Sequence, residues 1–117
     1  MAKVPLRPLD APATPSEVSV FVEDDHFVFK ADDARAIYCF DKDKVGQSNC
    51  NGTCTRLWRP VQAPTDAGTV GDWTVVIRAD GSRQWAYKGK PVYTFIQDEA
   101  GQTKGDGIQG VWHVVSP

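Results

Sequence analysis

Two stretches decide the fold: residues 37–46 read IYCFDKDKVG, and residues 92–101 read VYTFIQDEAG. Both place Tyr-x-Phe-x-x-Asp-x-x-Gly directly after an apolar residue. The same offset of 55 residues (38 to 93) also relates Gln47 to Gln102 and Gly52 to Gly107, while Trp58 and Trp112 are 54 apart. So many matches in register indicate an internal repeat.

The composition is that of one ordinary globular domain. The chain has 117 residues, of which 41% are hydrophobic and 24% charged, and its formal net charge is −2. A domain of this length can bury a single modest core. There is no basic stripe, which argues against nucleic-acid binding, and no apolar run approaches the roughly 18 residues of a membrane span.

The chain divides into an N-terminal linker and a folded part. Residues 1–16 carry four prolines and no apolar period, which predicts a stiff, Pro-rich linker. Residues 17–117 then form one β domain, with repeat one over about 27–61 and repeat two over about 73–115. The strand candidates are 18–22, 27–30, 36–40, 73–78, 83–87, 92–96 and 111–115, and 79–82 is a hairpin turn.

The central strand of each repeat is apolar on both faces. Tyr38 and Phe40 share one face and Ile37 and Cys39 the other, because side chains alternate along a strand. Burial on both sides follows. Eight prolines, ten glycines and no long helical period complete the picture of a small antiparallel all-β domain. We expect a sandwich or barrel-like arrangement of two pseudo-symmetric repeats.

The repeated motif supplies the first site candidates. In Asp-x-x-Gly the Asp opens and the Gly closes a type I turn, and the carboxylate can accept backbone N–H groups that the turn leaves free. We therefore expect a structural role first and a binding role second. The residues are Tyr38, Phe40, Asp43, Tyr93, Phe95 and Asp98.

The cysteines allow two interpretations. Three residues separate Cys50 from Cys54, and one of them is glycine, so the two side chains can form a disulfide; this implies an oxidising compartment. Cys39 would then remain as an inert, buried small hydrophobic residue. The alternative is a copper or haem-type ligand carrier in which Cys50 and Cys54 act with His113 or His26. We favour the disulfide, because no local motif places either histidine.

No catalytic constellation is visible, so we expect a protein that is not an enzyme and needs no cofactor. The aromatic content is high, with four Trp, three Tyr and five Phe. Such residues more often fill a β core, but an exposed cluster would suit a planar ligand or a partner protein.

These residues resemble the bacterial predicted-lipoprotein family that carries a "secreted repeat of unknown function". The resemblance spans residues from about 27 to 115, and one departure is Arg59, where members usually have proline. It implies an extracytoplasmic protein of the cell envelope, secreted or lipid-anchored through a longer precursor, with no assigned activity. The motif elements are Tyr-x-Phe-x-x-Asp in both copies, Cys50 to Cys54, Trp58, Pro60, Arg78, Asp80-Gly81, Gln84, Tyr87, Gly89, Pro91, Gly101, Gly105, Gly107 and Gly110-Val111-Trp112.

We therefore expect a non-catalytic binding or interaction module of the bacterial envelope. Its partner would be an unknown envelope protein or small ligand. The metal or haem-type carrier is the alternative.

Overall fold

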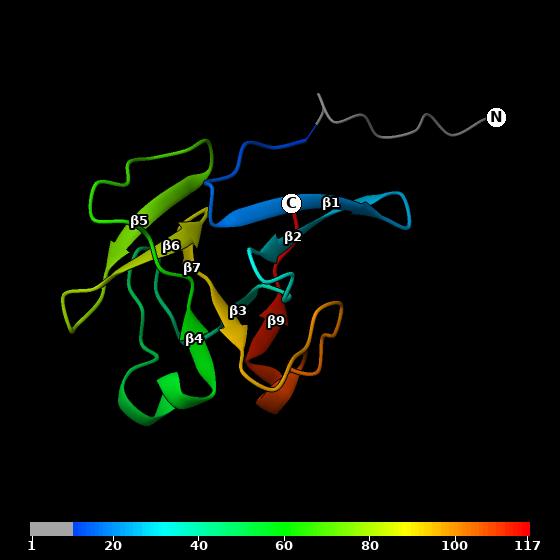
Figure 1. Ribbon diagram of the computed structural model, residues 1–117. Helices are drawn as coiled ribbons and strands as arrows, with labels where there is room; N and C mark the ends of the chain where they lie inside the picture. The colour runs from blue at the N-terminus through cyan, green and yellow to red at the C-terminus, as the bar shows by residue number, and fades with distance from the viewer. Residues whose placement is uncertain (1–10) are drawn as a thin grey trace.

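The computed structural model describes residues 11–117, which form short antiparallel strands joined by turns and two single-turn 3₁₀ helices (Figure 1). The predicted all-β, antiparallel fold is confirmed, and the sheets do not close into a barrel. The described strands are β1 (Val18–Glu23), β2 (His26–Ala31), β3 (Tyr38–Phe40), β4 (Trp58–Pro60), β5 (Trp73–Ile77), β6 (Arg83–Tyr87), β7 (Lys90–Pro91), β8 (Tyr93–Phe95) and β9 (Trp112–Val114).

The strands form three sheets, and the largest is built from both ends of the chain. Its order is β4-β8-β3-β9, while β1–β2 is a hairpin and β5-β6-β7 a three-stranded sheet. Figure 1 shows β9, from the C-terminus, lying beside β3. Each of the three strand pairings in the four-stranded sheet joins one strand from before residue 61 to one from after residue 72. No other described sheet mixes the two halves of the chain in this way.

The offset seen in the sequence also relates the elements. Adding 55 to the bounds of β3 gives the bounds of β8, and adding 54 to those of β4 gives those of β9. The β1–β2 hairpin precedes β3 as the β5–β6 hairpin precedes β8, and the starts of β1 and β5 are 55 residues apart (18 to 73), although the bounds of β2 and β6 do not keep this offset. Backbone hydrogen bonds follow the same rule: Val115 N–H donates to the Ile37 carbonyl at 2.8 Å, and Val61 N–H donates to the Val92 carbonyl at 3.1 Å.

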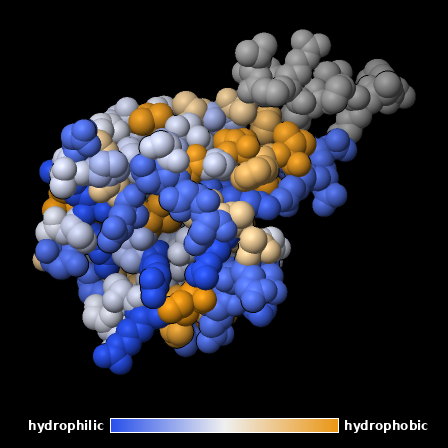
Figure 2. Space-filling model, viewed as in Figure 1, coloured by the Kyte–Doolittle hydropathy of each residue, from blue (hydrophilic) through white to orange (hydrophobic). Residues whose placement is uncertain are grey.

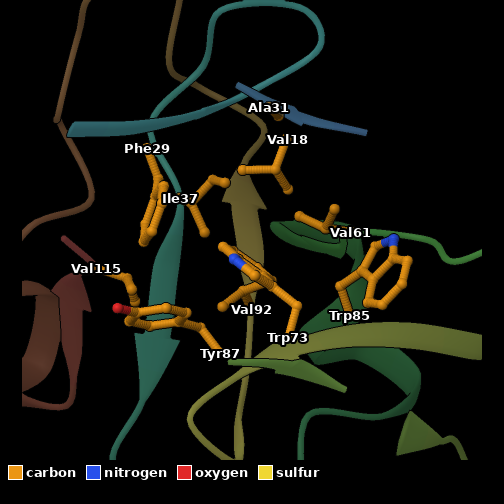
Figure 3. Close-up of a cluster of buried hydrophobic side chains, with 10 residues drawn as sticks. All are labelled: Val18, Phe29, Ala31, Ile37, Val61, Trp73, Trp85, Tyr87, Val92 and Val115. Atoms are coloured by element: carbon orange, nitrogen blue, oxygen red, sulfur yellow. The ribbon is translucent and has the colours of Figure 1, made fainter. Parts of the chain in front are cut away.

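Two hydrophobic cores lie on opposite faces of the four-stranded sheet, as the alternation in residues 37–40 requires. One core is aliphatic and aromatic, and in it the rings of Phe29, Trp73 and Tyr87 meet with centroids 4.9–5.0 Å apart (Figure 3). Ile37 and Val92 reach this core from the central strands. The second core contains Tyr38, Tyr93 and the rings packed around them.

The turns that follow the central strands differ by one residue from the prediction. Gln47 N–H donates to the Lys44 carbonyl, so the closed turn spans 44–47 and Gly46 is its third residue, with φ of 71°. Glycine takes this left-handed conformation without steric cost. Gly101 has φ of 81° in the corresponding turn.

The Pro-rich segment falls partly outside the described residues, since 1–10 are not described. Residues 11–16 lead into β1 without forming a strand, and Pro15 is buried. Hydrophobic surface gathers over the β1–β2 hairpin (Figure 2), where Phe21 and Val22 are exposed. No helix in residues 11–117 is long and apolar enough to cross a membrane.

Candidate functional site

The tyrosine of each motif is hydrogen-bonded to the aspartate of the other motif. Tyr38 Oη donates to Asp98 Oδ2 at 2.6 Å, and Tyr93 Oη donates to Asp43 Oδ2 at 2.8 Å. The two tyrosines are themselves partners across β3 and β8. The motif therefore holds the two halves together.

The other carboxyl oxygen of each aspartate accepts a backbone N–H six residues further along the chain. Asn49 N–H donates to Asp43 Oδ1 at 2.6 Å, and Lys104 N–H donates to Asp98 Oδ1 at 2.7 Å. A structural role for both carboxyl groups follows from these contacts. The tyrosine partners could not be read from turn chemistry, because they lie in the other half of the chain.

The two pairs differ in burial. Asp98 is 1% exposed, whereas Asp43 is only partly buried. Burial raises the pKa of the Asp43 carboxyl above its usual range, although the Asn49 N–H, the Tyr93 hydroxyl and the Arg78 charge oppose the shift. Burial also raises the pKa of Tyr93 to about 12 and that of Tyr38 well above its ordinary range.

A buried arginine connects the Tyr93 pair to the cysteine loop. Arg78, which follows β5, donates through Nη1 to Ser48 Oγ at 3.0 Å and through Nη2 to the Cys50 carbonyl at 2.6 Å. Ser48 Oγ also contacts Tyr93 Oη. Since the Tyr93 proton is donated to Asp43, the serine is the donor in that contact. A cation from the second half thus anchors the loop of the first half.

Cys50 and Cys54 form a disulfide, as predicted, and Cys39 is free. Because the two sulfur atoms are bonded to each other, they are not thiolate ligands in this structure. His113 lies on the opposite face of the sheet from Trp112 and pairs with Asp41, and His26 begins β2. The alternative ligand set is therefore not formed, and residues 11–117 contain no group of three His, Cys, Asp or Glu arranged to hold a metal.

Four aromatic rings form a continuous stack on one face of the sheet, and its central contact joins the edge strands β4 and β9. Trp58 and Trp112 lie face to face with centroids 3.7 Å apart. Phe40 stacks on Trp112 at 4.2 Å, and Phe95 stacks on Trp58 at 4.4 Å. The order Phe40–Trp112–Trp58–Phe95 alternates between the two halves of the chain, and we call it the aromatic ladder. It contains both phenylalanines of the predicted motif.

An open groove of about 630 Å³ runs along the ladder. The ladder rings line it together with the apolar side chains of Leu57 and Ile108 and the polar side chains of Lys42, Gln97 and Gln109. Leu57 is 46% exposed. Both faces of Trp58 and Trp112 are covered by neighbouring rings, and the two side chains are buried. Only the edges of these rings therefore border the groove. The volume is in the range of small-molecule sites, which combine apolar walls with a few polar groups.

The groove brings together residues that the sequence pattern did not connect. Phe40 and Phe95 were identified from the repeated motif, but the rim residues Leu57 and Ile108 stand in loops without any pattern.

The architecture is that of an all-β protein of two interlocked halves around one aromatic ladder. Residues 74–116, from β5 to the C-terminus, match the model of a family described as a secreted repeat of unknown function. The match confirms the resemblance over that segment, and the family's description makes this an extracytoplasmic protein. No curated protein and no solved structure matches the chain.

Proposed function

We propose that the protein is a non-catalytic binding module of the bacterial envelope, which holds a flat, apolar ligand in the groove along the aromatic ladder. The observation that carries this proposal is the groove itself, which is lined by the half-buried Phe40, by the edges of the three buried rings of the ladder and by the exposed Leu57, with polar side chains at its rim. An extracytoplasmic family agrees with this role.

The chemistry of the groove defines the ligand class. Ring edges carry partial positive charge and ring faces partial negative charge. A flat aromatic or conjugated ligand laid across the ring edges would therefore present its negative face to them. Lys42, Gln97 and Gln109 can bind acceptor groups at its periphery.

The motif carboxylates support a binding rather than a catalytic role for the protein. Both oxygens of Asp43 and of Asp98 already accept hydrogen bonds within the fold. Neither carboxyl group lines the groove. We therefore assign these carboxyl groups to the stability of the fold and the groove to binding.

The haem-type alternative has less support at this groove. Among the described residues that line it there is no histidine or methionine, and its one cysteine, Cys54, is in the disulfide. A haem iron is usually held by His, Met, Cys or Tyr. The groove suits a ligand held through its ring system and its peripheral acceptor groups, without a bond to a metal.

The test is binding of an aromatic probe, the dye ANS, to the native protein, followed by its fluorescence. We expect saturable binding that Leu57→Gln weakens about tenfold, because an exposed apolar wall is lost from the groove. Ile77→Gln is the matched control, since Ile77 is 59% exposed on β5, outside the groove. Equal binding by both variants would place the dye elsewhere and contradict the proposal.

A further inference from the structure

A second cluster of reactive groups lies on the face of the sheet opposite the aromatic ladder. Cys39 on β3 and His113 on β9 are direct cross-strand partners, so their side chains leave the sheet on the same face. Asp41, two residues beyond Cys39, pairs with His113 Nε2 at 2.7 Å. All three line one pocket of about 340 Å³, which we call the thiol pocket.

The remaining walls of the thiol pocket are apolar at the base and cationic at the rim. Tyr87 and Val115, from the first hydrophobic core, line it beside the half-buried Cys39. Lys88 and Lys90 are exposed and line it as well. A small molecule with an apolar middle and anionic ends matches this distribution.

The pocket at the equivalent position of the other half has the opposite charge. There Thr94 and Arg59 are the cross-strand partners, at the positions of Cys39 and His113. Asp32 and Asp33 stand 55 residues before Tyr87 and Lys88 and line that pocket with Glu17. The two sites share a backbone arrangement, so the thiol and its cations are specific to one of them.

We propose that the thiol pocket is a site of thiol–disulfide exchange, at which Cys39 reacts with a small disulfide that carries carboxylate groups. The protein is extracytoplasmic and already contains the Cys50–Cys54 disulfide, so an oxidised thiol is the co-reactant its compartment supplies.

The groups of the pocket have distinct roles in this step. Burial raises the pKa of the Cys39 thiol, while the charge of Lys90 opposes the shift. A base is therefore needed, since only the thiolate attacks a disulfide. His113 is the cross-strand partner of Cys39 on the same face of the sheet, and Asp41 holds one of its ring nitrogens, which leaves the other to take a proton. This is the relation of a nucleophile, a base and an orienting carboxylate.

The atoms balance without a further reagent. The Cys39 thiol gives its proton to His113, and its sulfur forms a bond to one sulfur of the small disulfide as that S–S bond breaks. The departing thiolate takes the proton from His113. The products are a mixed disulfide on Cys39 and one small thiol.

The experiment compares oxidised glutathione, which is anionic, with the neutral disulfide of mercaptoethanol on the full chain. Intact mass follows the rates, and peptide mapping locates the adduct. We expect both reagents to modify native Cys39. The rate with oxidised glutathione divided by the rate with the neutral disulfide should be about tenfold higher for the native chain than for the urea-unfolded chain, because the cationic rim attracts the anion. Lys88→Gln with Lys90→Gln should remove this preference. His113→Asn should slow the reaction with both reagents by roughly 100-fold or more.

The equivalent pocket provides a matched control. Cys39→Ser with Thr94→Cys moves the thiol to the acidic site, where the glutathione-to-neutral ratio should fall below that of the unfolded chain. Three results would overturn the proposal. They are a native Cys39 that stays unmodified while the unfolded chain reacts, a ratio equal in the native and unfolded chains, and a lysine variant that keeps the full preference.

Discussion

Asp43 and Asp98 occupy equivalent positions but experience different surroundings. Each accepts one tyrosine hydroxyl and one backbone N–H, and an amide oxygen could replace only one of the two carboxyl acceptors. Asp98 is 1% exposed, so water cannot accept the hydrogen bond of the N–H or hydroxyl donor that the amide leaves without an acceptor. Around the partly exposed Asp43 it can.

We therefore predict that Asp98→Asn lowers the free energy of unfolding by about 2 kcal/mol, and Asp43→Asn by about 1 kcal/mol or less. Urea denaturation followed by circular dichroism measures both variants against the parent chain, and each serves as the matched control for the other. Equal losses, or a larger loss for Asp43→Asn, would show that burial does not set the strength of these pairs.

The raised pKa of Tyr93 predicts how the stability of the protein changes at alkaline pH. Its pKa is raised to about 12 in the folded state, against about 10 in an unfolded chain. The unfolded state therefore loses this proton first, so the contribution is fully present below about pH 10 and is lost as pH rises to about 12. Tyr93→Phe should make the fall in stability over this window shallower, while Tyr38 still contributes in the same direction. Urea midpoints across the window measure the slope, and an unchanged slope in the variant would refute the assignment.

At the level of single residues, the repeat in the sequence indicated which residues belong together, but it did not indicate which residues they contact. The repeated Tyr, Phe and Asp positions all proved to lie around the junction of the two halves. Their partners are 50 or 60 residues away in the chain, and local turn chemistry contains no information about such contacts. Arg78 was noted only as part of the family resemblance, because nothing near it in sequence shows that it reaches the Cys50 loop.

Among the elements, every strand candidate in the sequence corresponds to an observed strand, and only β4 and β7 were not expected. The candidates 36–40, 92–96 and 111–115 contain the three-residue strands β3, β8 and β9. The patterns at 18–22, 27–30, 73–78 and 83–87 correspond to β1, β2, β5 and β6. β7 has only two residues, Lys90 and Pro91, which is too short for an alternating pattern to show. It forms because Pro91, which lacks an N–H, can stand at the edge of a sheet.

The pairing of the elements could not be predicted from these patterns. β3 is flanked by β8 and β9, and β8 by β4 and β3. Strands that adjoin in sequence are neighbours in most folds, and that rule would have paired β3 with β4. The ring pairs Phe40–Trp112 and Trp58–Phe95 lie on neighbouring strands of this order, and the Trp58–Trp112 contact joins its two edge strands, β4 and β9.

Over the whole molecule, the two halves complete one another. Both strands that flank β3 come from the second half, and both that flank β8 come from the first. The Tyr–Asp pairs, the Arg78 contacts and the aromatic ladder cross the same junction. The first half on its own would keep only the β1–β2 hairpin, and the second half only the β5-β6-β7 sheet, in which β7 has two residues. Isolated hairpins are marginally stable in water, and a small sheet needs a packed hydrophobic face.

The most direct test of this interlocked architecture is to separate the halves at Gly68 and Thr69, which are both exposed in the connector between β4 and β5. Amide NMR spectra would be recorded for fragments 1–68 and 69–117, alone and mixed in equal amounts. We predict poorly dispersed spectra for each fragment and a dispersed spectrum like that of the intact chain for the mixture. A dispersed spectrum from either fragment as a monomer would contradict the account, because that half would then fold without the other.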